Sequence, residues 1–274
     1  MSERVAVRKT YKLFIGGKFP RSESGRSYLV QDSNVSLASR KDARDAVVAA
    51  RAAVKGWAGA TAYNRGQILY RVAEMLEGRR EQFVALGVPA DEVDAAIDRW
   101  VWYAGWSDKL AQVYGGANPV AGPYFNISAP EPTGVVAVVA PEQPALLGLV
   151  SVVAPAIVTG NTVVVAASPA QPLAAVTLAE VLATSDLPGG VVNLLTGRIS
   201  ETVPTLASHM DVNAIDLTGV ADAELGADLE VKAAENLKRV LRPAPADHDW
   251  FADPGVARMT TLLETKTVWH PKGV

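Results

Sequence analysis

The second half of the chain alternates between short, wholly apolar runs and longer apolar segments with helical spacing. The short runs are rich in Val, Ile and Leu and are bounded by Gly, Asn, Thr or Pro, a pattern typical of strands buried on both faces. They are "GVVAVVA" (134–140), "NTVVVAAS" (161–168), "GGVVNLLTG" (189–197) and "NAIDLTG" (213–219). The segments between them predict helices over 145–160, 172–185 and 201–210. This alternation predicts an α/β fold, a doubly wound parallel sheet with flanking helices on both faces.

The first half predicts a hairpin and three helices. "YKLFIGGKFPR" (11–21) has strand-forming residues on both sides of Gly16-Gly17, a hairpin signal. Ser39 and Asp42 form a capping pattern at the start of the first helix. The expected helices cover 40–57, 64–87 and 91–114. The third carries Trp and Tyr at helical spacing, which indicates packing between helices rather than a ligand platform.

Two segments predict strands outside the sheet. Residues 115–134 are dense in Pro and Gly, and within them Phe125 and Ile127 alternate with other side chains, as in an exposed, extended arm. "LLETKTVWHP" (262–271) predicts a final strand that includes Thr265, Thr267 and Val268. Unpaired strand edges associate readily, so retention of both segments points to a partner strand from another chain. Pairing of the two segments within one chain is the alternative, and the sequence leaves it open.

Composition narrows the possible partners. The formal net charge is −3, which gives no reason to expect nucleic acid or an acidic membrane surface. The chain has no cysteine, so disulfides, thiolate metal sites and thiol nucleophiles are excluded for these residues.

Pro155 and the Gly160-Asn161 pair interrupt the apolar stretch 144–168 before it could form a membrane span. The charged N-terminus lacks the apolar core of a signal peptide, and we expect a cytoplasmic protein.

No local motif carries recognisable chemistry. The three histidines are scattered through the chain, and we predict neither catalytic residues nor a metal site. Ligands of open parallel sheets lie beyond the carboxyl ends of the strands. The turns there offer few polar groups: Ser168 after one strand, and Thr218-Gly219 ahead of a helix, whose backbone N–H groups are candidates for binding phosphate. Asp222 in the same turn would repel a diphosphate.

Longer stretches resemble a known family. "EPTGVVAVVAPEQPALLGL" (131–149), the run 154–197 and "ASHMDVNAIDLTG" (207–219) resemble the coenzyme-binding domain of the NAD(P)-dependent aldehyde dehydrogenase superfamily. "FIGGKF" (14–19), "YAGWSDK" (103–109) and "AENLKRV" (234–240) extend the resemblance over nearly the whole chain. It implies a Rossmann-like coenzyme-binding-type domain over 1–255, with the arm inserted at 115–133. It also implies a C-terminal oligomerisation strand over 256–274.

The chain departs from the family at the residues that carry its chemistry. Gln143 stands where the family has an oxyanion-stabilising asparagine. The family's lysine and glutamate, which hold the adenosine ribose, are replaced by Ala166 and Pro169, and Ser168 alone keeps the family residue. "LRP" (241–243) replaces the segment with the glutamate general base. The resemblance therefore implies a truncated homologue without the catalytic domain, whose cysteine nucleophile the family requires.

These departures favour a catalytically inactive structural or regulatory subunit. We expect it to associate with itself or with a full-length aldehyde dehydrogenase through the arm and the final strand. Two lost ribose contacts cost about 1.5–3 kcal/mol each, so we expect no cofactor, or NAD(P) bound at millimolar affinity or weaker. Ser168, Thr218 and Gly219 are the vestigial candidates for cofactor binding. The alternatives are an NAD(P)-binding module without catalysis, or a component of an active aldehyde dehydrogenase whose partner supplies the thiolate.

Overall fold

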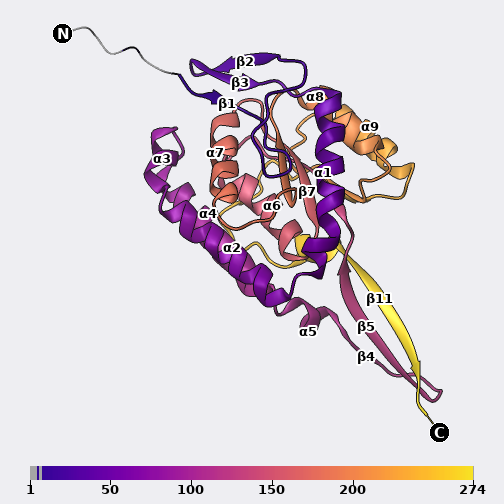
Figure 1. Cartoon of the computed structure of the whole chain (residues 1–274). Coiled ribbons are helices and arrows are strands. Elements are labelled where there is room, and N and C mark those ends of the chain that lie inside the picture. Colours follow the sequence, from indigo (N-terminus) through magenta and orange to yellow (C-terminus); the bar gives the residue numbers. More distant parts are fainter. Residues whose placement is uncertain (1–4, 6–7, 274) are drawn as a thin grey trace.

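The structure is a computed structural model that describes residue 5 and residues 8–273. Its centre is a five-stranded parallel sheet with the strand order β10-β9-β6-β7-β8 (Figure 1). The strands are β6 (Val135–Val139), β7 (Thr162–Ala166), β8 (Val192–Leu195), β9 (Ala214–Asp216) and β10 (Arg239–Leu241). The predicted parallel sheet is confirmed. The sequence pattern did not reveal β10, because this half-buried edge strand is only three residues long and begins with a charge.

Alternate strand residues face two separate apolar clusters. Val136 and Val138 pack on one side of the sheet, and Val135, Ala137 and Val139 pack on the other. Because both faces are buried, the strands carry no polar alternation. This arrangement is why "VVAVV" appears in the sequence as an uninterrupted apolar run.

Helices cover both faces of the sheet. One face carries α1 (Arg40–Gly59), α8 (Ile199–Ser208) and α9 (Ala223–Ala234). The other carries α6 (Leu147–Val158) and α7 (Pro172–Ala183), with α2 (Ala62–Glu77) and α4 (Ala90–Trp106) packed outside them. Shorter helices are α3 (Arg80–Ala85), α5 (Leu110–Tyr114) and α10 (Ala257–Thr261).

Local sequence signals explain several helix ends. The predicted capping box is present, since Ser39 Oγ accepts the Asp42 N–H at 3.2 Å and the Asp42 carboxylate accepts the Ser39 N–H at 2.8 Å. The helix expected over 64–87 is divided into α2 and α3, because α2 ends at Gly78. The helix expected over 91–114 ends earlier, at Ser107, and α5 follows it. Inside α4, Trp100 and Tyr103 are buried, in line with helix packing.

The N-terminal region adds a small sheet beside β8. Its strands are β1 (Thr10–Tyr11), β2 (Ser27–Val30) and β3 (Ser33–Ser36). The predicted turn at Gly16-Gly17 is confirmed, since Ile15 and Lys18 exchange backbone hydrogen bonds of 2.9 and 3.0 Å across it. Phe14 joins this segment to Leu194 of β8.

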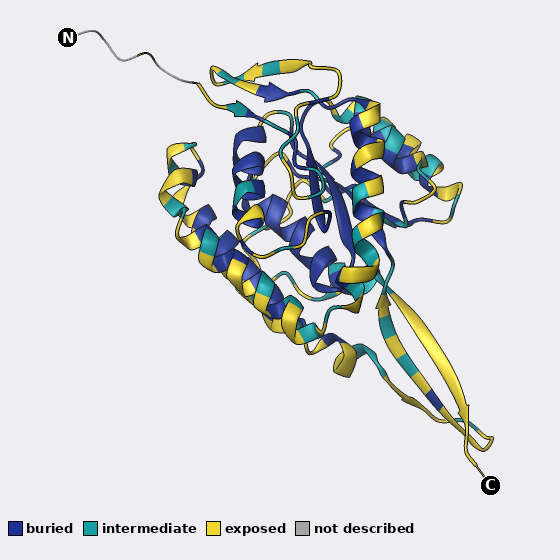
Figure 2. Cartoon of the chain, viewed as in Figure 1, coloured by how far each residue is buried: buried dark blue, intermediate teal, exposed yellow. Residues whose placement is uncertain are grey.

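The arm is a separate three-stranded antiparallel sheet that projects from the body of the molecule (Figure 1). Its strands are β4 (Gly116–Asn118), β5 (Tyr124–Pro132) and β11 (Leu263–Pro271). β5 pairs with β11 along its whole length, with Ile127 opposite Val268. The two segments therefore pair within one chain, which is the alternative that the sequence left open. Figure 2 shows that most of the arm is exposed.

Asn161 ties the base of the arm to the sheet. Its side-chain oxygen accepts the Gly134 N–H at 2.7 Å, and its side-chain nitrogen donates to the Leu262 carbonyl at 2.9 Å. Gly134 precedes β6 and Leu262 precedes β11, so one buried side chain fixes where both strands begin. Across the part of the chain that the structure describes, the helices are too short or too polar to cross a membrane.

Candidate functional site

The carboxyl ends of the central strands form one edge of the sheet. Val139 of β6 lies opposite Ala166 of β7, and Val138 lies opposite Asp216 of β9. The turn at Ser168 and the turn at Thr218-Gly219 therefore flank the end of β6 on its two sides. This is the edge at which the fold offers a ligand site.

Ser168 lies in the turn between β7 and α7. The hydroxyl oxygen accepts the Ala170 N–H at 3.2 Å, and the Ser168 carbonyl accepts the Gln171 N–H at 3.3 Å. Its side chain is nearly buried, and Ala166 and Ala167 before it are buried too. The hydroxyl thus stabilises its own turn, and the end of β7 presents methyl groups rather than charged or amide side chains.

The Thr218-Gly219 turn uses its backbone donors within the fold. The Thr218 N–H donates to Asp216 Oδ1 at 2.9 Å, and the Gly219 N–H donates to the Val139 carbonyl at 3.0 Å. The helix that follows begins only at Ala223, and Asp222 caps it by accepting from Glu224 and Leu225. A carboxylate of the chain itself therefore stands at the positive end of α9.

Gly219 is required by the packing of two turns. A Cβ atom at this position would lie 2.2 Å from the Ala140 carbonyl oxygen, far inside contact distance. The end of β9 and the end of β6 therefore approach each other more closely than any side chain would allow. Gln143, in the turn after β6, is exposed together with Glu142.

A buried ion pair at this edge was not predicted from the sequence. Arg258 Nη1 donates to Asp216 Oδ2 at 2.9 Å and to Thr218 Oγ1 at 2.9 Å, and the Thr218 hydroxyl donates to Asp216 Oδ1. Asp216 is almost fully buried, and this burial raises its pKa against the attraction of Arg258. The Asp at the end of an apolar strand was the available signal, but nothing nearby in the sequence identified Arg258 as its partner.

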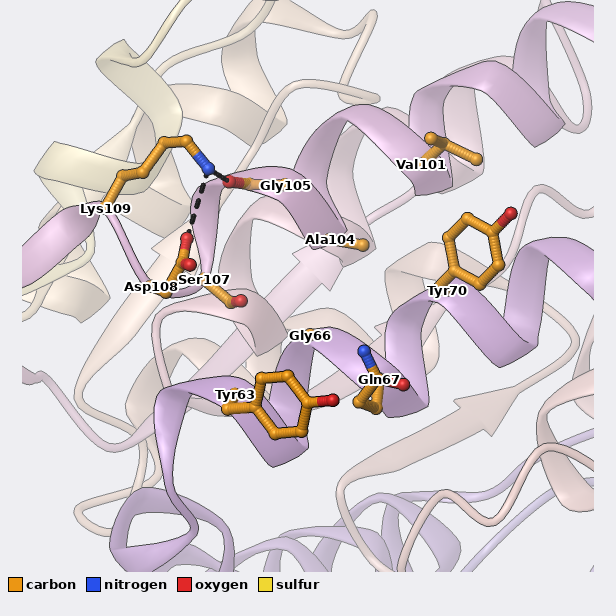
Figure 3. Close-up of a pocket in the computed structure, with 10 residues that line it drawn as sticks. All are labelled: Tyr63, Gly66, Gln67, Tyr70, Val101, Ala104, Gly105, Ser107, Asp108 and Lys109. Atoms are coloured by element: carbon orange, nitrogen blue, oxygen red, sulfur yellow. Dashed lines mark hydrogen bonds and ion pairs between the residues drawn. The ribbon is translucent and has the colours of Figure 1, made fainter.

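A pocket lies away from the sheet edge, between α2 and α4. It has a volume of about 300 Å³, and Figure 3 shows Tyr63, Gln67 and Tyr70 along one wall. On the other wall Lys109 is held by Asp108 and by the Gly105 carbonyl, so its charge is already paired. This pocket contains none of the candidate cofactor-binding residues Ser168, Thr218 and Gly219.

The remaining polar candidates do not form a catalytic group. His209 accepts the Asp211 N–H through Nδ1 at 3.1 Å, His248 lies beside Trp250, and His270 lies on the arm in β11. Among residues 8–273, no group of three or more His, Asp or Glu side chains is placed to hold a metal ion.

Comparisons with known proteins identify the family. The model of the aldehyde dehydrogenase family matches residues 31–243. The chain belongs to the aldehyde dehydrogenase family. It is 33% identical over 253 residues to retinal dehydrogenase 2 of Homo sapiens, covering 85% of this chain and 48% of that protein. It is 32% identical over 250 residues to aldehyde dehydrogenase, cytosolic 1 of Elephantulus edwardii, covering 84% of this chain and 49% of that protein.

Solved structures agree with the family assignment. An NAD⁺ complex of an aldehyde dehydrogenase from Bacillus cereus matches with a TM-score of 0.80 and 27% identity. The match covers 85% of this chain and 50% of that one. The chain thus spans about half the length of the family members that it matches. The α/β sheet predicted from the sequence is the sheet that these enzymes share.

Proposed function

We propose that this chain is a catalytically inactive aldehyde dehydrogenase-like protein that acts as a structural or regulatory subunit. It associates with itself or with a full-length aldehyde dehydrogenase, and the proposal keeps the cytoplasmic location expected from the sequence. The observation that carries it is the exposed apolar face of the arm.

One face of the arm carries an exposed apolar row. Residues opposite each other in an antiparallel pair share a face, so Ala117, Ile127 and Val268 form one apolar row across the three strands. Phe125 lies beside this row on the same face. Phe125, Ile127 and Val268 are 59%, 46% and 36% exposed, which favours a face that another molecule covers.

The opposite face is polar along its middle and carries an exposed aromatic pair, Tyr124 and Trp269, at the start of β5 and the end of β11. Asn118 donates to Asn126 at 2.5 Å and to Ser128 at 2.8 Å, and Ser128 shares a hydrogen bond of 2.9 Å with Thr267. Thr265 lies on this face as well. Of the strand residues expected to contact a partner, only Val268 therefore shares the apolar face with Phe125 and Ile127.

A second exposed apolar area supports association. Leu237 is 89% exposed, and its backbone has a left-handed φ of 57° that leucine rarely adopts. Met210 is also exposed. The Asn236 side chain donates to the Met210 carbonyl at 3.1 Å, which brings Met210 close to Leu237. Two large apolar side chains at a strained turn are costly in water and favoured at an interface.

The absence of the family's nucleophile and general base from this sequence supports the inactive role. This sequence has no cysteine to attack an aldehyde carbonyl, and Leu241, Arg242 and Pro243 stand where the family carries its general base. The alternative of an NAD(P)-binding module is favoured by the match to an NAD⁺ complex. Internally bonded N–H groups at Thr218-Gly219 and the Asp222 cap argue for weak binding at most.

The arm can be tested with a pair of charged substitutions. Phe125→Asp combined with Ile127→Asp places two carboxylates on the apolar face, and we expect the mass measured by light scattering to fall to that of a single chain. Circular dichroism should stay unchanged because the central sheet does not contact these side chains. Val48→Asp on α1 removes an exposed apolar side chain elsewhere and should leave the assembly intact. An assembly that persists in the arm variant contradicts the proposal.

A further inference from the structure

A small, partly enclosed cavity lies between two helices and the segment that precedes α10. Its volume is about 50 Å³. Arg99, Tyr103 and Ser151 line it from α4 and α6, and His248, Asp253 and Arg258 line it from the other side. The helix side chains are almost fully buried, so this end of the cavity is closed to solvent.

Arg99 is a buried positive charge with neutral partners. Nη1 donates to Ser151 Oγ at 2.8 Å, and Nη2 donates to the carbonyls of Trp250 and Ala252 at 2.8 and 3.0 Å. Within residues 8–273 no carboxylate lies within 4.0 Å of this guanidinium. Burial lowers the pKa of Arg99, and the attraction of Asp253, which lies beyond ion-pair distance, opposes this only in part. Such a charge is costly unless an anion accompanies it.

Tyr103 adds an unused donor at the same place. Its hydroxyl is buried and has no hydrogen-bond partner among the described residues. Burial raises the pKa of Tyr103 to about 12, so the hydroxyl keeps its proton at neutral pH. Buried hydroxyls normally find an acceptor, and the cavity is the space in which one would lie.

The other charged groups define the two ends of the cavity. Arg258 uses one guanidinium nitrogen for Asp216 and Thr218, which leaves its other N–H groups available. Asp249 and Asp253 are exposed, and each accepts a backbone N–H of its own loop, from Phe251 and Gly255. The inner end is therefore rich in donors, and the carboxylates stand at the outer rim.

We propose that this cavity binds a small carboxylate anion, whose oxygens accept from Arg99 and from the Tyr103 hydroxyl. The volume corresponds to about two water molecules at about 30 Å³ each, which suits formate or acetate and excludes a sugar phosphate. The anion supplies both the missing counter-ion of Arg99 and the missing acceptor of Tyr103. This proposal does not depend on how the arm associates.

A titration of the intact chain tests this site. Sodium formate, acetate, phosphate and chloride are added at constant ionic strength, and the melting temperature is followed by calorimetry. Formate or acetate should raise the melting temperature until the effect saturates, because an anion that binds the folded state stabilises that state. Tyr103→Phe removes one hydrogen bond to a charged group and should weaken the binding at least about 10-fold. Tyr28→Phe is the matched control, since its hydroxyl is buried in β2, and it should bind as the parent does.

Three results would contradict the proposed carboxylate site. The first is the absence of saturable stabilisation by any of the anions, which leaves the cavity to water alone. The second is equal affinity in the Tyr103→Phe variant and the parent chain. The third is an equal response to chloride or phosphate, which marks a general salt effect rather than recognition of a carboxylate.

Discussion

Arg258 donates to the buried carboxylate of Asp216 at 2.9 Å and thereby joins the C-terminal segment to the end of a central strand. Arg258 lies in α10, directly before β11, and its neighbours Met259 and Leu262 are buried in the core. The position of the arm strand thus depends on the edge of the sheet at which open parallel sheets offer a ligand site.

This ion pair predicts strong coupling between its two members. Arg258→Met leaves the Asp216 charge buried without its cation and should cost about 3–5 kcal/mol in the free energy of unfolding. Asp216→Asn should cost a similar amount, and the double variant should cost clearly less than the sum of the two. Urea unfolding of all four proteins provides the measurement, and additive costs would contradict the coupling.

The Gly219 packing predicts opposite effects for two glycines in neighbouring elements. Gly219→Ala drives a methyl group into the Ala140 carbonyl and should destabilise the chain by about 3 kcal/mol. Gly226→Ala lies inside α9, where the new Cβ meets atoms only at 3.8 Å, and should stabilise by about 1 kcal/mol. Thermal unfolding distinguishes them, and a neutral Gly219→Ala variant would show that the turns separate easily.

The stability contributed by an ion pair at the base of the arm should depend on pH. Arg239 binds Glu264 through two bonds of 2.8 and 2.7 Å, and this holds the pKa of Glu264 below its usual value of about 4.3. The stabilisation is therefore present above that value and is lost as the pH falls through the lowered pKa. Because both groups are partly exposed, we expect less than about 1 kcal/mol.

Glu264→Gln should remove this pH-dependent part. Urea unfolding between pH 7 and pH 3 should show the parent chain losing its advantage over the variant as the pH falls. Glu142→Gln, at an exposed turn, serves as the control and should follow the parent chain. A constant difference between Glu264→Gln and the parent at every pH would contradict the assignment.

The sheet edge predicts weak binding of dinucleotide. Calorimetric titration of NAD⁺ into the pure chain should give a Kd in the millimolar range or no heat of binding. The physical reason is that Ala166 and Pro169 offer no polar side chain to the ribose, and the Thr218 and Gly219 N–H groups already have acceptors. Low-micromolar binding would favour the NAD(P)-binding module instead.

The central sheet was predictable because its signal is local. β6, β7 and β8 are buried on both faces, so each is an apolar run that short turns interrupt. The capping box at Ser39 was predictable for the same reason, since its partner is three residues away. β10 escaped prediction because an edge strand of three half-buried residues has no such run.

The contacts that define the site and the arm are distant in sequence. Arg258 and Asp216 are separated by 42 residues, and Arg99 reaches Trp250 across 151 residues. Only the fold brings these partners together, so neither Arg258 nor Arg99 could be assigned a role from its neighbours in the sequence. Pairing of β5 with β11 has the same character, because the sequence predicts two strands but not the chain that each one pairs with.

The most direct test of the account is native mass spectrometry of the protein purified from its own host. We predict species heavier than the single chain of 28.9 kDa, either as multiples of that mass or joined to a full-length aldehyde dehydrogenase. A single chain alone, even when a full-length family member is co-expressed, would contradict the proposed role as a subunit.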